Sequence, residues 1–69
     1  MNHRQYDVLE YAILRGERVA IQRRGTEFVL VPLRLRTEGK REALEAKHPT
    51  TGERMVMFVD EIERVEAVR

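Results

Sequence analysis

The sequence predicts a mainly β domain with one α-helix at its N-terminus. Before Gly16, apolar residues recur every three or four positions, which indicates an amphipathic helix. After Gly16, apolar and polar residues tend to alternate, and turns rich in Gly and Pro separate short apolar segments, as is typical of strands. With 69 residues, the chain is expected to form a single domain, with the helix at about 4–15 and the β unit at about 18–68.

One side of the predicted helix is apolar. Its members are Tyr6, Leu9, Ala12 and Ile13. Asn2 can cap the first turn, and Gln5 follows three residues later, as in a capping box. Gly16 is suited to end the helix, because glycine tolerates the left-handed conformation at that position.

The five predicted strands follow one another through tight turns. They are residues 19–22, 26–36, 41–48, 54–59 and 65–68. Pro32 lies inside the second of them and has no N–H to donate, so it marks a sheet edge or a bulge. Residues 60–63 are expected to form a single helical turn between the last two strands, with Asp60 as its cap.

Five short strands expose two unpaired edges unless the sheet curls up. We therefore expect a small five-stranded barrel of the SH3-like or Sm-like type. The alternative is a flat sheet with the helix on one face. The segment 28–31 is apolar at every position, so one face of this strand is expected to meet the interior and the other the helix or a partner subunit.

Five segments in succession form a pattern: a helix, an alternating strand, a valine–proline element with leucines, a third strand and a final isoleucine. These segments are Leu9–Ile13, Arg18–Arg23, Leu30–Leu35, Glu42–Ala46 and Val59–Ile62. In this pattern the chain resembles the WYL domain of bacterial transcription regulators. Glu42, Ala43 and Leu44 stand at the positions of the family's Trp-Tyr-Leu triplet. The resemblance implies an Sm-like barrel that acts as a regulatory module and binds nucleic acid or a nucleotide-like ligand.

The composition excludes several kinds of catalytic and metal site. The chain contains no Cys and no Ser, so it has no disulfide, no Cys-ligated metal and no Cys or Ser nucleophile. His3 and His48 are the only imidazoles and lie far apart in the sequence, so no metal or other cofactor is expected. Asp60 and Glu61 are adjacent carboxylates, but acid–base chemistry needs an enclosed site, which a unit of this size does not suggest. We therefore expect no enzymatic activity.

Positive charge is concentrated in the first part of the chain. Residues 1–41 carry nine Lys or Arg against five acids, whereas residues 42–69 carry four against seven. Guanidinium groups on a pleated strand suit phosphate or carboxylate recognition. The candidate contacts to nucleic acid or another anionic ligand are Arg23, Arg24, Arg34, Arg36, Arg41 and Arg54. In the alternative interpretation, these arginines only pair with glutamates across the strands.

A second hypothesis is a protein-interaction or self-assembling module without nucleic-acid binding. Its contact residues would be Phe28, Leu30 and Val56, and oligomerisation would supplement the small core of so short a chain. No apolar run approaches the roughly 20 residues that a membrane span needs, and the N-terminus lacks a signal-peptide pattern, so no membrane partner and a cytoplasmic location are expected.

Overall fold

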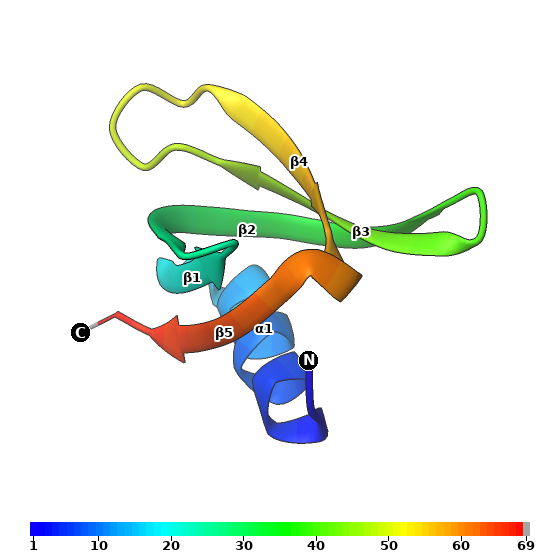
Figure 1. Ribbon diagram of the computed structural model, residues 1–69. Helices are drawn as coiled ribbons and strands as arrows, with labels where there is room; N and C mark the ends of the chain where they lie inside the picture. The colour runs from blue at the N-terminus through cyan, green and yellow to red at the C-terminus, as the bar shows by residue number, and fades with distance from the viewer. Residues whose placement is uncertain (69) are drawn as a thin grey trace.

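In the computed structural model, which describes residues 1–68, one helix precedes five strands (Figure 1). A short 3₁₀ turn, η1, connects the last two strands. The elements are α1 (His3–Arg15), β1 (Val19–Arg23), β2 (Thr26–Glu38), β3 (Arg41–Lys47), β4 (Arg54–Phe58), η1 (Val59–Glu61) and β5 (Ile62–Ala67). The predicted mainly β class with an N-terminal helix is confirmed.

The ends of α1 are as the sequence predicts. The Asn2 side chain accepts a hydrogen bond from the Gln5 amide, and the Gln5 side chain accepts one from the Asn2 amide, which completes the capping box. Gly16 ends the helix in the left-handed conformation, with φ of 68°. Leu9 and Ala12 are buried beneath the helix, so its apolar side faces the core.

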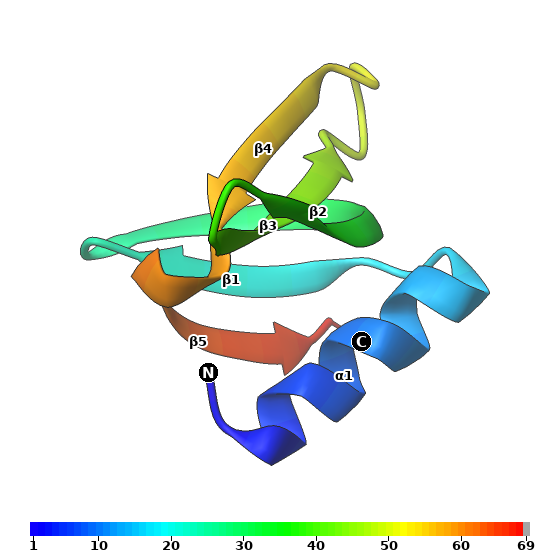
Figure 2. The same cartoon turned by 90° about the vertical axis from the view of Figure 1, so that its right-hand side faces the viewer.

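The five strands form one antiparallel sheet in the order β4-β3-β2-β1-β5. The long strand β2 pairs with β1 through residues 26–30 and with β3 through residues 31–38. The sequence predicted a sheet edge or a bulge at Pro32. Pro32 lies beyond the β1 pairing, and the register of the β3 pairing shifts between Pro32 and Arg34. This arrangement lets the β3–β4 hairpin rise away from β1 and β5 (Figure 2).

The sheet is not closed into the predicted barrel. Among residues 1–68, β4 pairs only with β3 and β5 only with β1, so the two edge strands do not meet in a ladder. The chain passes between them through η1, which turns it away from β4 before β5 begins. On the opposite side from the β3–β4 hairpin, α1 packs against β5 and β2 and covers the core (Figure 2).

The prediction that Asp60 caps the short helical turn is wrong. Phe58 occupies the capping position with extended backbone, and no side chain bonds to the turn there. Asp60 lies within the turn instead, and its carboxylate binds Arg41. The last strand also begins earlier than predicted, at Ile62, directly after the turn.

The core lies between the sheet and α1. Its fully buried side chains include Leu9, Val19, Ile21, Leu44 and Met57, which come from α1, β1, β3 and β4. Every buried side chain in residues 1–68 is apolar. Within the same residues, no helix combines the length and the apolar character that crossing a membrane requires.

Candidate anion-binding face

The arginines of β2, β3 and β4 are positioned by strand alternation and register. In β3, Leu44 and Ala46 point into the core, so Glu45 and Lys47 point to the opposite face, which we call the outer face. The register places Arg34 and Val56 on either side of Glu45. It places Arg54 next to Lys47, at the end of the same face.

Glu45 is the centre of a cluster of three residues, Arg34, Glu45 and Arg54, here called the Glu45 cluster. Arg34 Nε donates to Glu45 Oε1 at 2.9 Å, and Arg54 Nη1 donates to Oε2 at 2.8 Å. The Glu45 side chain is 12% exposed, whereas each arginine side chain is 65% exposed. Hydrogen bonds from Arg34 and then Arg54 hold the pKa of Glu45 below its usual range.

The Glu45 cluster has more positive than negative charge. Arg34, Arg54 and Glu45 together carry a net charge of +1. The neighbouring Lys47, which is outside the cluster, raises the charge of this part of the outer face to +2. Each guanidinium carries five N–H donors, and the contacts to Glu45 occupy one donor of each. The remaining donors are available to an anion that reaches the outer face.

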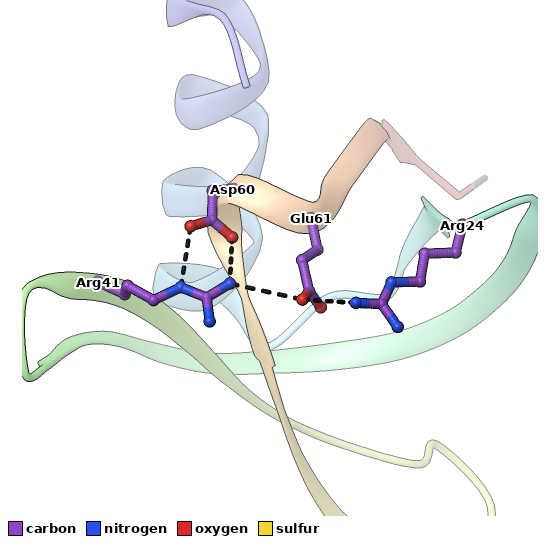
Figure 3. A network of polar contacts seen from close by, with 4 residues as sticks. All are labelled: Arg24, Arg41, Asp60 and Glu61. Carbon is purple, nitrogen blue, oxygen red and sulfur yellow. Dashed lines mark hydrogen bonds and ion pairs between the residues drawn. The ribbon is translucent and has the colours of Figure 1, made fainter.

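A second set of charges, the turn cluster, joins η1 to the turns on either side of β2. Its members are Arg24, Arg41, Asp60 and Glu61 (Figure 3). Arg41 Nε and Nη2 contact the two Asp60 oxygens at 2.9 and 2.6 Å, and Arg24 Nη2 contacts Glu61 at 2.9 Å. These hydrogen bonds from Arg41 lower the pKa of Asp60. Arg41 also stacks over the Phe58 ring, 3.6 Å from its centroid.

The turn cluster is electrically balanced. Two arginines face two carboxylates, so Arg24 and Arg41 stabilise the position of η1 and offer no excess charge to a ligand. The pairing of arginines with glutamates across the strands, the alternative interpretation from the sequence, occurs at Arg34–Glu45 and Arg54–Glu45. In the turn cluster the acids come from η1 instead, and one of them is the aspartate Asp60.

The last two predicted arginines lie apart from both clusters. Arg36 pairs with Glu38 on its own strand at 3.1 Å. The Arg23 guanidinium carbon lies 5.1 Å from the centroid of the Phe28 ring. Phe28 pairs with Ile21, whose side chain is in the core, so Arg23 lies at the edge of the core side of the sheet. Of the six predicted arginines, the structure therefore brings together Arg34 with Arg54, and Arg24 with Arg41.

Lys47 is a member of the outer face that the predicted site set lacked. Its outward direction follows from alternation in β3, but its position beside Arg54 depends on the β3–β4 register. Alternation along β3 therefore predicts that Lys47 shares a face with Glu45. The sequence does not show which residue of β4 pairs with Lys47, so it does not predict the contact with Arg54.

The predicted apolar contact set is corrected at Leu30. Leu30 is 2% exposed and lies in the core, where it pairs with Val19, so it offers no surface to a partner. Phe28 packs against the same core. Val56 is 43% exposed on the outer face, and Val29, between Phe28 and Leu30, is the exposed side chain of this part of β2. Strand alternation sends Val29 and Leu30 to opposite faces.

The position of the family triplet has a structural role in this chain. Glu42, at the start of β3, accepts a hydrogen bond from the Tyr6 hydroxyl of α1, and this contact raises the pKa of Tyr6. Ala43 and Leu44 are fully buried. Glu42 thereby connects the helix to the sheet.

Comparison of the chain with protein-family models, with curated proteins and with solved structures finds no match in any of the three. The resemblance to the WYL domain therefore stays a hypothesis. In residues 1–68, no three His, Asp or Glu side chains gather where they could hold a metal ion.

Proposed function

We propose that this chain is a non-enzymatic binding module that recognises nucleic acid or another polyanion through the outer face of β2, β3 and β4. The observation that supports this proposal is the Glu45 cluster together with Lys47. Two largely exposed arginines bind a single carboxylate there, and Lys47 lies opposite Arg54 in the pairing of β3 with β4.

Glu45 would act by holding the two guanidinium groups in place before a ligand arrives. Because Arg34 and Arg54 bind opposite oxygens of the same carboxylate, their flexible side chains are restrained side by side. A phosphate would then accept hydrogen bonds from their remaining N–H groups, with less loss of side-chain entropy than on free arginines.

The two aromatic residues of the sheet favour recognition of phosphates over stacking on bases at this face. Phe58 belongs to the outer face but lies beneath the Arg41 guanidinium, and Phe28 packs against the core. Base stacking needs exposed rings. In this proposal, binding of the anion would serve the regulatory role that the WYL resemblance implies.

Fluorescence anisotropy with labelled single- and double-stranded oligonucleotides at low salt tests the proposal. We expect binding that weakens as salt rises, with a slope that corresponds to about three phosphate contacts, because neutralised phosphates release counterions. The double variant Arg34→Gln/Arg54→Gln should lose most of this binding.

Arg64→Gln is the matched control, because Arg64 on β5 is 64% exposed and also pairs with a glutamate, Glu66. It should bind like the unmodified chain. Absence of binding at low salt to both kinds of oligonucleotide, or equal losses in the double variant and the control, would refute the proposed function.

A further inference from the structure

Arg36 lies on the outer face of the sheet together with the Glu45 cluster and Lys47. It follows Arg34 by two residues along β2, so their Cα atoms are about 6.5–7 Å apart. Leu35, between them, packs against the core, so strand alternation sends Arg34 and Arg36 to the outer face. Arg36 therefore extends the positively charged part of this face along β2, although it makes no contact with the Glu45 cluster.

Four cations follow one diagonal line across the paired strands β2, β3 and β4 (Figure 1). In order they are Arg36, Arg34, Lys47 and Arg54, here called the cation stripe. From its first to its last member the stripe crosses two strand spacings and four residue rises, so its ends lie about 16 Å apart. Glu45 lies in the middle of the stripe, where it binds Arg34 and Arg54.

Apolar side chains border the cation stripe on both sides. On β2, Val31 pairs with Lys47, and on β4 the exposed Val56 pairs with Glu45. The positive charge is therefore concentrated in a narrow line instead of a broad patch. A line of cations suits a linear polyanion, because the charges of such a chain also follow one another in a line.

Glu38 marks one end of the cation stripe. Its carboxylate accepts a hydrogen bond from Arg36 Nη2 at 3.1 Å, and both side chains are exposed. This contact occupies one of the five guanidinium donors, so Arg36 keeps donors for a ligand. A polyanion that continued along β2 beyond Arg36 would meet the Glu38 carboxylate, which limits the site to about four negative charges, one for each cation.

We propose that the cation stripe binds one linear chain of phosphates that lies diagonally across the three strands, with about four consecutive phosphates in contact. This inference rests on the proposed function, and it adds the form of the ligand, its direction and Arg36 as a further contact. Three of the four cations are arginines, whose fork of N–H donors matches phosphate oxygens. A single strand of nucleic acid and a linear inorganic polyphosphate share this chemistry.

Ligands of increasing length test the phosphate chain. Fluorescence anisotropy would use labelled oligothymidylates with about two, four and eight phosphates at low salt. Affinity should rise about tenfold or more between two and four phosphates, and less than about threefold between four and eight. Equal affinity for the shortest and the longest oligothymidylate would refute the chain. Competition by unlabelled oligothymidylate and by linear polyphosphate of equal charge would show which source of the chain binds more tightly.

Arg36→Gln tests whether the stripe reaches Arg36. For the longest oligothymidylate, this variant should bind about fivefold more weakly, and the slope of log affinity against log salt should fall by about 0.7, the value of one contact to a single strand. Arg64→Gln is the matched control, because Arg64 also pairs with a glutamate two residues further along its own strand, Glu66, at 2.9 Å. It should change neither the affinity nor the slope.

Removal of Glu38 should have the opposite effect. Glu38→Gln frees Arg36 and removes a negative charge from the end of the stripe, so affinity should rise about threefold, a gain that damage to the fold would not produce. The control Glu66→Gln should bind like the unmodified chain.

The outcomes separate this inference from the proposed function. If long oligothymidylates bind, but Arg36→Gln and Glu38→Gln behave like their controls on β5, the cation stripe is refuted and the proposed function stands. If the unmodified chain binds no oligonucleotide at low salt, both are refuted.

Discussion

Arg41 and Asp60 form a two-point ion pair between the first residue of β3 and the 3₁₀ turn that precedes β5. Arg41 Nε lies 2.9 Å from Asp60 Oδ2, and Nη2 lies 2.6 Å from Oδ1. Nη2 also approaches Glu61 at 3.5 Å, so one guanidinium holds both carboxylates of the turn. The sheet is open between β4 and β5, and this contact anchors the segment that joins them.

Asp60→Asn is expected to destabilise the fold slightly. The substitution removes the carboxylate that Arg41 binds, and exposed ion pairs contribute little, so the melting temperature should fall by no more than about 5 °C. Thermal denaturation followed by circular dichroism would measure the change. Arg64→Gln, which breaks an exposed pair within β5, should leave the melting temperature unchanged. A larger fall for Arg64→Gln than for Asp60→Asn would contradict the anchoring role.

Stability is expected to decrease at acidic pH through Glu45 and Asp60. Arginine hydrogen bonds lower the pKa of both carboxyl groups in the folded state, so the unfolded chain binds their protons first. Their contribution is therefore present above the unfolded pKa of about 4 and is lost as pH falls through the lower folded values. Urea denaturation between about pH 7 and pH 2 would follow this loss. In the double variant Glu45→Gln/Asp60→Asn, the free energy of unfolding should fall less with decreasing pH than in the unmodified chain. An equal fall in both proteins would show that other carboxylates cause it.

Tyr6 is expected to ionise at higher pH than an ordinary tyrosine. The neutral hydroxyl donates to the Glu42 carboxylate, and this hydrogen bond, desolvation and the nearby negative charge raise the pKa of Tyr6 above 10.0. The contact therefore stabilises the fold below about pH 10 and is lost as pH rises through the raised value.

An absorbance titration of the Tyr11→Phe variant would report on Tyr6 alone, since the chain has two tyrosines. The further change Glu42→Gln should move the midpoint down towards 10. An unchanged midpoint would show that Glu42 does not bind Tyr6 in solution.

Leu30→Ala and Val29→Ala are expected to differ strongly although the residues are adjacent. Leu30 is buried against Val19, and truncation of a buried leucine costs about 2–5 kcal/mol. Val29 is 40% exposed on the other face, so its truncation should cost about 0.5 kcal/mol or less. Urea denaturation of both variants measures the difference, and similar costs would contradict the assignment of the two faces.

The local elements could be predicted from the sequence because their signals are short-range. The cap pair of Asn2 and Gln5 and the left-handed Gly16 place the ends of α1, and alternation locates the strands to within a few residues. Pro32 predicts an interruption of the ladder, at an edge or a bulge, because a missing N–H has the same consequence in any sheet, and the β3 pairing shifts register there. Charge counts likewise showed that arginines would gather in the first part of the chain.

Which arginines come together was decided by strand register and by the path of η1. Alternation places Arg34 on a face but does not state that Glu45 and Arg54 lie beside it, because pairing partners are distant in the sequence. Every residue of the segment 28–31 is apolar, so the two-residue alternation of a strand does not identify its buried face. Pairing with β1 and packing against α1 decided which face is buried. The sequence by itself thus determined the helix, the strands and their turns, since these depend on neighbouring residues. The tertiary structure alone decided the open sheet, the Glu45 cluster and the cation stripe, since these depend on contacts between distant segments.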